Sequence, residues 1–229
     1  MTTRLDGIRA CVFDAYGTLF DFASAADACR DEIGPVTDRL TALWRDKQLA
    51  YSWLRAAQGR HADFAQVTAD SLDFTLETLG LDNRPALRER LLNLYMTLKP
   101  FPEVPDLLRR LWDAGMPAAI LSNGTPEMLE ALVAAAGFDD FFAEVMSVEA
   151  VGVFKPSPRV YQLAVDRFGV PPECIAFQSS NAWDIHGASA FGFRTVWCNR
   201  YGQRRERLPG APDVEIATLA DLPAILGLV

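Results

Sequence analysis

The 229-residue sequence is poor in the side chains that build metal or disulfide frameworks. It has four cysteines, and no two of them are spaced as a Cys-x-x-Cys pair. Cys11, Cys174 and Cys198 lie in or beside apolar stretches, so we expect buried free thiols without a disulfide framework or a zinc site. The two histidines, His61 and His186, have no serine or carboxylate beside them as a catalytic triad requires, so we assign them no catalytic role.

Positive charge and long apolar runs are also scarce. The net charge of −8 excludes the basic surface that a nucleic-acid or acidic-membrane partner requires. No stretch reaches the length of a bilayer span, and the N-terminus lacks the pattern of a signal peptide. We therefore expect a cytoplasmic protein in which any anionic ligand is held by a local positive site.

What the sequence does contain is an alternation of buried strands and helices. Residues 8–13 are mostly apolar and partly β-branched or aromatic, which is typical of a strand buried on both faces of a parallel sheet. Further strands are expected at 117–122, 142–148, 174–178 and 195–198, and they alternate with helices expected at 125–136, 158–168 and 181–191. This pattern predicts an α/β fold, with a Rossmann-like parallel sheet core and helices on both faces.

The chain between the first strand and this alternation is helical from about residue 21 to residue 98. Its candidate helices are 37–58, 63–79 and 84–98. A block of this length does not fit into a crossover between strands, so we predict an inserted all-helical cap domain above the strand ends. The predicted boundaries are 1–18 and 97–229 for the core and 19–96 for the cap, and 204–212 is expected to be a surface loop.

Asp14 closes the first predicted strand and is followed by a Gly-Thr turn. It therefore lies at the carboxyl end of a parallel strand, where open α/β sheets bind ligands. From this position alone, Asp14 could cap the next helix through its carboxylate or take part in chemistry.

The residues around Asp14 favour chemistry, because the stretch DAYGTL at residues 14–19 resembles the first motif of the haloacid dehalogenase superfamily. In that family the Asp is a covalent nucleophile. Phosphatases of the superfamily carry a second Asp two places later, which protonates a leaving alcohol, and this sequence has Tyr16 there. A tyrosine cannot serve as that acid near neutral pH, and a leaving halide needs no proton. The resemblance therefore points to the (S)-2-haloacid dehalogenases.

Two further stretches resemble the second and third motifs of the superfamily. Ser122 and Asn123 end the second core strand, where the family has a Ser or Thr, although Ser-Asn-Gly alone is more often a turn. Lys155 precedes a proline between strand and helix, as in the third motif, and Tyr161 follows it as in the dehalogenases. A lone lysine is more often solvated surface, so its assignment depends on the resemblance.

The stretch SSNAWD at residues 179–184 resembles the fourth motif with one change. Phosphatases have an Asp where this chain has Ser180, and magnesium prefers several oxygen ligands including carboxylates. The resemblance therefore implies no metal and no cofactor. Asp184 could orient Lys155 or help to activate water, or it could only favour the helix N-terminus. Gln178, just before this stretch, departs from the family pattern and is assigned no function.

Arg45 is the most informative residue of the predicted cap. It shares a helix face with Leu49 and Trp53, and a charge on an apolar face needs a partner, a ligand or a route to the surface. The stretch LWRDKQLAYSWLR at 43–55 resembles the dehalogenase cap helix, in which this Arg lies on the halide side. Phe64 matches the family's aromatic wall near the halogen, or it belongs to the cap core.

The resemblance implies hydrolysis of short (S)-2-haloalkanoic acids to (R)-2-hydroxyalkanoic acids. Asp14 would displace the halide to form an ester, and water would then attack the Asp carbonyl. Arg45 and Asn123 would stabilise the leaving halide. Ser122, Lys155 and the backbone N–H groups at positions 15 and 16 would hold the substrate carboxylate, and the charge of Lys155 would favour the ionised form of Asp14.

The residues that this resemblance assigns form two groups. The catalytic group is Asp14, Thr18, Arg45, Ser122, Asn123, Lys155, Tyr161, Ser179, Asn181 and Asp184, and the substrate-binding group is Ala15, Tyr16, Leu49, Phe64 and Trp183. The partners implied are a small-molecule 2-haloacid and a second copy of the chain, with no nucleic acid and no membrane. Two alternatives stay open: a magnesium phosphatase of the same superfamily and a non-catalytic carboxylate-binding homologue.

Overall fold

A six-stranded, fully parallel sheet lies at the centre of the computed structural model, which describes residues 4–228. The strand order is β3-β2-β1-β4-β5-β6. The strands are β1 (Ala10–Phe13), β2 (Ala118–Ser122), β3 (Glu144–Ser147), β4 (Ile175–Ser179), β5 (Arg194–Cys198) and β6 (Val214–Ile216). The predicted Rossmann-like α/β fold is confirmed. The first strand begins at Ala10 and is shorter than expected, and the edge strand β6 was not predicted.

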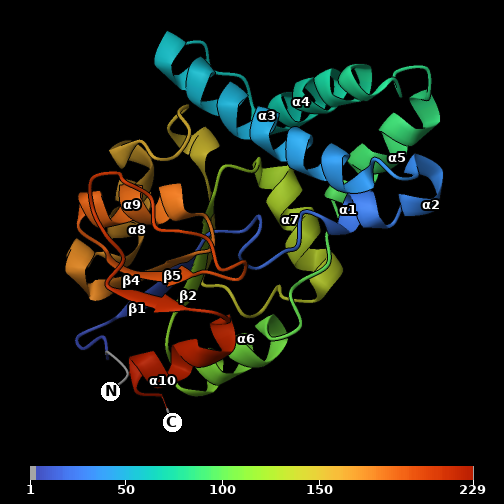
Figure 1. Cartoon of the computed structure of the whole chain (residues 1–229). Coiled ribbons are helices and arrows are strands. Elements are labelled where there is room, and N and C mark those ends of the chain that lie inside the picture. The colour runs from blue at the N-terminus through green and yellow to red at the C-terminus, as the bar shows by residue number, and fades with distance from the viewer. Residues whose placement is uncertain (1–3, 229) are drawn as a thin grey trace.

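Helices cover both faces of this sheet (Figure 1). They are α6 (Val104–Asp113), α7 (Pro126–Ala136), α8 (Pro158–Phe168), α9 (Ala182–Phe191) and α10 (Leu222–Leu226), with short 3₁₀ turns at Val148–Ala150, Pro172–Cys174 and Leu219–Asp221. Helices α8 and α9 pack together on one face, whereas α6 and α10 pack together on the other. Neither α6 nor α10 was predicted.

The helical block between β1 and α6 lies to one side of the sheet, in the upper part of Figure 1. It consists of α1 (Ser24–Asp27), α2 (Arg30–Ile33), α3 (Thr37–Gln58), α4 (Phe64–Leu79) and α5 (Pro85–Tyr95). Helix α3 has the predicted bounds, because Gly59 takes the left-handed conformation that ends a helix, with φ of 64°. Asp63 caps α4 by accepting the N–H of Gln66 at 2.7 Å.

The two connections between this block and the sheet run side by side. The N–H of Asp21 donates to the carbonyl of Lys99 at 2.8 Å, and the N–H of Phe101 donates to the carbonyl of Leu19 at 2.9 Å. The block is therefore attached through one narrow double connection, close to the predicted boundaries. The division into a core of 1–18 and 97–229 and a cap of 19–96 stays a prediction.

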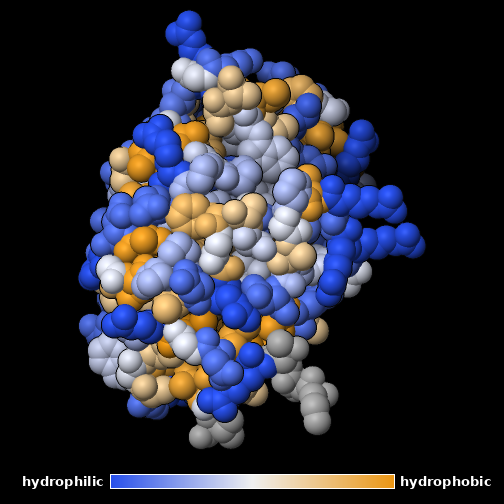
Figure 2. Space-filling model, turned by 90° about the vertical axis from the view of Figure 1, so that its left-hand side faces the viewer, coloured by the Kyte–Doolittle hydropathy of each residue, from blue (hydrophilic) through white to orange (hydrophobic). Residues whose placement is uncertain are grey.

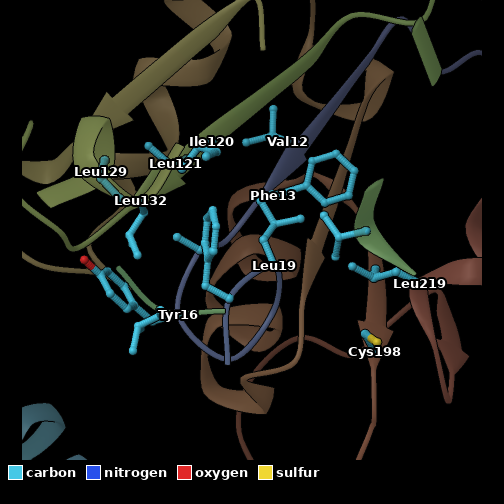
Figure 3. Packing of buried hydrophobic residues seen from close by; sticks show 14 of the residues in the cluster. Val12, Phe13, Tyr16, Leu19, Ile120, Leu121, Leu129, Leu132, Cys198 and Leu219 are labelled. Carbon is cyan, nitrogen blue, oxygen red and sulfur yellow. The ribbon is translucent and has the colours of Figure 1, made fainter. Parts of the chain in front are cut away.

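The core of the sheet is apolar and closely packed (Figure 3). Side chains of β1 and β2 pack with Leu19 and with α7, and all four residues of β1 are buried. Gln178 of β4 is an exception, because its amide is fully buried and no protein group among residues 4–228 hydrogen-bonds to it. All four cysteines are free, but Cys174 is only half-buried, so the prediction of buried thiols was wrong for that residue.

The surface combines hydrophilic residues with separate apolar patches on the face that Figure 2 shows. Residues 204–212 form no helix or strand and are mostly exposed, as predicted. Among the described residues, no helix is both long enough and apolar enough to cross a membrane.

Candidate active site

The site lies where β2, β1 and β4 end, because these strands are neighbours in the sheet. Their carboxyl ends carry Asn123, Asp14 and Ser179. The N–H of Asp14 donates to the carbonyl of Gln178 at 2.9 Å, which extends the β1–β4 pairing to the carboxylate itself. Because β2 pairs directly with β1, the polar end of β2 lies beside the end of β1 that carries Asp14.

A tight turn after β1 positions the next residues. Gly17 has φ of +85°, a conformation that favours glycine, and a Cβ there would lie 3.3 Å from the ring of Phe22. The carbonyl of Ala15 accepts the N–H groups of Leu19 and Phe20, both at 3.0 Å. This turn brings the hydroxyl of Thr18 under the carboxylate.

Three donors converge on one oxygen of Asp14. Its Oδ2 accepts hydrogen bonds from Asn181 Nδ2 at 2.7 Å, Thr18 Oγ1 at 3.1 Å and Ser179 Oγ at 3.4 Å. Thr18 Oγ1 also accepts the N–H of Ser180 at 2.8 Å. Residues 179–184 are thereby hydrogen-bonded to residues 14–19, and these bonds fix the orientation of Oδ2.

The other oxygen, Oδ1, faces a buried cation. Lys155 Nζ lies 3.2 Å from Asp14 Oδ1 and 2.8 Å from Asp184 Oδ2, and it lies 4.9 Å from the centre of the Phe177 ring. The N–H of Lys155 donates to Asn123 Oδ1 at 3.0 Å, so the end of β2 fixes this loop. A fully buried ammonium needs such partners.

Asp184 completes a buried charge cluster. It accepts a hydrogen bond from the hydroxyl of Tyr161 on Oδ1 at 2.8 Å. Burial raises the pKa of Asp184 to about 6, although Lys155 acts in the opposite direction and Asp14 adds to the rise. Burial lowers the pKa of Lys155, but the two carboxylates outweigh it and hold that pKa above its ordinary value. Lys155 is therefore cationic at neutral pH.

Arg45 enters the site from α3. Its Nη2 donates to Asn181 Oδ1 at 3.2 Å, its Nη1 donates to Gln48 Oε1 at 2.8 Å, and its guanidinium lies over the Phe22 ring at 5.3 Å. Asn181 thus links Arg45 directly to Asp14 Oδ2. A cleft of about 390 Å³ opens beside these residues, and Leu49 and Trp183 line it together with Arg45 and Asn181.

Aromatic rings pack around Tyr16, which follows Asp14 by two residues. The Tyr16 ring lies 5.4 Å from Phe64 and stacks on Tyr95 at 5.3 Å. Its buried hydroxyl has no protein partner within the described part of the chain. A Cβ at Gly124 would lie 2.9 Å from that hydroxyl, so a glycine is required there. In Figure 3, Tyr16 lies at the edge of the apolar core.

Backbone donors lie beside the carboxylate as well. In residues 4–228, the N–H groups of Ala15 and Tyr16 donate to no protein group, although both residues are buried. Ser122 Oγ accepts the N–H of Gly124 at 3.2 Å, and its hydroxyl hydrogen donates to no protein group in the described residues. Of the predicted carboxylate-binding groups, the two N–H groups and the hydroxyl of Ser122 therefore have hydrogens free to donate to a ligand.

The donor set does not suit a metal ion. Asn181 Nδ2 donates both to Asp14 Oδ2 and to the carbonyl of Tyr16, at 2.7 and 3.1 Å. Lys155 Nζ lies between the carboxylates of Asp14 and Asp184. The oxygens that could ligate a cation thus face N–H donors and a positive charge. That the reaction needs no metal stays a prediction.

Neither histidine belongs to the site. His61 Nε2 lies 2.8 Å from Glu149 Oε2, and His186 Nδ1 lies 3.1 Å from the carbonyl of Pro209. The sequence reasoning did not identify Gln48 and Tyr95, which contact Arg45 and Tyr16. Gln48 follows Arg45 on the same helix face, and that spacing was the one available signal.

Comparison with known proteins gives consistent matches. Residues 8–192 match the family model of haloacid dehalogenase-like hydrolases. The chain belongs to that family. The sequence is 45% identical over 222 residues to (S)-2-haloacid dehalogenase 1 of Pseudomonas sp. (strain CBS-3), covering 97% of this chain and 98% of the relative. It is 47% identical over 216 residues to the (S)-2-haloacid dehalogenase of Pseudomonas sp. (strain YL), covering 94% and 93%.

A solved structure of the same family has the same fold. It is the L-2-haloacid dehalogenase from Xanthobacter autotrophicus with chloropropionic acid covalently bound, with a TM-score of 0.90 and 41% identity. The match covers 96% of this chain and 98% of that chain. The haloacid dehalogenase-like fold of this chain therefore extends over both the sheet and the helical block.

Proposed function

We propose that this haloacid dehalogenase-like hydrolase converts short (S)-2-haloalkanoic acids to (R)-2-hydroxyalkanoic acids and halide through an aspartyl ester. The observation that carries the proposal is the pair of unlike environments around Asp14. Oδ2 accepts three hydrogen bonds, whereas Oδ1 accepts a hydrogen bond from Lys155 alone among the described residues. Oδ1 is therefore the oxygen free to attack carbon.

In the first step, Asp14 Oδ1 forms a bond to C2 and the bond from C2 to the halogen breaks with its electron pair on the halide. The free N–H groups of Ala15 and Tyr16, the hydroxyl of Ser122 and the ammonium of Lys155 would hold the substrate carboxylate. Arg45 would stabilise the leaving halide together with the amide of Asn123. Because these donors meet more negative charge in the transition state than in the substrate, they raise the rate.

In the second step, water attacks the ester carbonyl carbon of Asp14 and loses a proton. The negative charge then forms on Oδ2, which already accepts hydrogen bonds from Thr18, Ser179 and Asn181. These three side chains act as an oxyanion hole that needs no rearrangement. The bond from the carbonyl carbon to Oδ1 then breaks, and the 2-hydroxyacid leaves with this oxygen and takes up a proton, which restores the carboxylate of Asp14. Asp184 can take part as the carboxylate that orients Lys155 or receives the proton of water.

Halide release from the two enantiomers of 2-chloropropionate in EDTA tests this function. We expect chloride from the S enantiomer only, with an unchanged rate when magnesium replaces EDTA, because no step uses a metal. Turnover of p-nitrophenyl phosphate with magnesium, without chloride release, would support a phosphatase instead. Tight binding of 2-haloacids without turnover would support the non-catalytic homologue.

The pH dependence should follow Asp184. As the pH falls through about 6, Asp184 takes up a proton and its ion pair with Lys155 is lost, so kcat should fall on the acid side. The hydrogen bond from Tyr161 lowers the pKa of Asp184. Tyr161→Phe should therefore move the acid limb of the kcat profile to higher pH. An acid limb at the wild-type position in Tyr161→Phe would show that Asp184 does not control it.

The proposal also covers the cellular location and the oligomeric state of the enzyme. A cytoplasmic location is supported by four cysteines that are all free, since free thiols are usual in a reducing compartment. A homodimer follows from the family resemblance alone.

A further inference from the structure

Gln48 lies one turn after Arg45 in α3 and is only 1% exposed. Its Oε1 accepts hydrogen bonds from Arg45 Nη1 at 2.8 Å and from the hydroxyl of Tyr95 at 3.2 Å. Its Nε2 donates to Thr68 Oγ1 at 2.8 Å. One buried amide therefore joins α3, α4 and α5 to the guanidinium that enters the site.

The orientation of this amide is fixed. The hydroxyl proton of Thr68 is used by the carbonyl of Phe64, to which it donates at 2.6 Å. Thr68 Oγ1 can therefore only accept from Gln48, which turns the amide oxygen of Gln48 toward Arg45. The reverse orientation would place an NH₂ group against the guanidinium, where two donors meet.

We propose that Gln48 is a positioning residue for halide displacement, which aims the guanidinium of Arg45 at Asn181 and the leaving-group side of Asp14. The inference rests on the proposed function and deepens it. Because the guanidinium is a rigid planar fork, holding Nη1 against Gln48 also fixes the direction of Nη2. Without Gln48, Arg45 keeps its charge but can take other rotamers.

A positioning role of Gln48 can be distinguished from a loss of stability in the helical block by comparing chloro and bromo substrates. Chloride is smaller than bromide, so its negative charge is more concentrated, and it is the poorer leaving group. Its departure therefore depends more on a correctly positioned hydrogen-bond donor. A displaced Arg45 should therefore slow the chloro substrate more than the bromo substrate. General loosening of the cap should slow both by similar factors.

The test measures kcat/KM on (S)-2-chloropropionate and (S)-2-bromopropionate, since this parameter covers the steps through displacement. Gln48→Leu should lose roughly 10- to 100-fold on the chloro substrate and lower the chloro-to-bromo ratio. Gln48→Glu keeps an oxygen acceptor for Nη1 but loses the N–H that Thr68 Oγ1 accepts, so it should lower the ratio less than Gln48→Leu does. Gln48→Met replaces Gln48→Leu if the latter does not fold.

Ser52→Ala is the matched control, because Ser52 is equally buried in α3 and its hydroxyl donates to the carbonyl of Gln48 at 2.8 Å. It should leave the ratio unchanged. If the wild type is active and Gln48→Leu has the same chloro-to-bromo ratio as the wild type, the positioning function is overturned. It is also overturned if Gln48→Glu lowers that ratio as much as Gln48→Leu does. A wild type that releases neither halide overturns the proposed function and this inference with it.

Discussion

Asp14→Asn should abolish halide release from (S)-2-chloropropionate, with a loss in kcat of roughly 10⁴-fold or more. The amide of asparagine is not a nucleophile, so no ester can form. The substitution is nearly isosteric and can keep the hydrogen bonds from Thr18 and Ser179 to the remaining oxygen. The fold should therefore survive, and the loss can be assigned to chemistry.

Two controls make this result interpretable. Asp106→Asn changes an exposed Asp of α6 and should keep wild-type activity. Mass spectrometry of the Asp14→Asn protein, before and after the assay, excludes conversion of the amide back to a carboxylate. Steady turnover by protein that still carries the amide would remove Asp14 from the chemistry.

Arg45→Lys should lower kcat on (S)-2-chloropropionate by roughly 10²- to 10³-fold. The guanidinium now contacts Gln48 and Asn181 through two different nitrogens, 2.8 and 3.2 Å away. An ammonium has one nitrogen on a flexible stem and cannot reach both groups while it also faces a halide. The rate of chloride release at saturating substrate measures this effect.

Arg55→Lys is the matched control for Arg45→Lys. Arg55 belongs to the same helix but pairs with Asp70 at 2.6 Å, away from Asp14. Its substitution should change kcat little. A near wild-type rate for Arg45→Lys would mean that Arg45 does not assist halide departure.

The regular parts of the fold could be predicted from local signals. Helix α3 was predicted with its observed ends, and Gly59 marks where it stops. Helix α4 was predicted to within one residue, and Asp63, the first residue predicted, is its cap. The short elements β6 and α10 carry too few residues for a periodic pattern. Their structure depends on packing against β5 and α6, which the sequence alone does not show.

The candidate site was predictable to the extent that strand ends determine it. Asp14, Asn123 and Ser179 lie at the carboxyl ends of neighbouring parallel strands, so their proximity follows from the topology. The contact of Gln48 with Tyr95 joins two cap helices that are distant in sequence, and no local pattern reports such a pairing. The hydrogen bond that Ser122 Oγ accepts from the N–H of Gly124 belongs to the turn after β2, and it shows that a strand-end residue can also serve its own turn.

A single turnover in ¹⁸O-labelled water, with enzyme in excess over (S)-2-chloropropionate, tests the covalent route most directly. Water attacks the carbonyl carbon of Asp14, so the new oxygen should stay on the enzyme. Mass spectrometry should find ¹⁸O in the peptide that contains Asp14, and the first 2-hydroxypropionate should be unlabelled and of R configuration. Label in the first product with none in that peptide would mean that water attacks C2 directly, which contradicts an aspartyl ester.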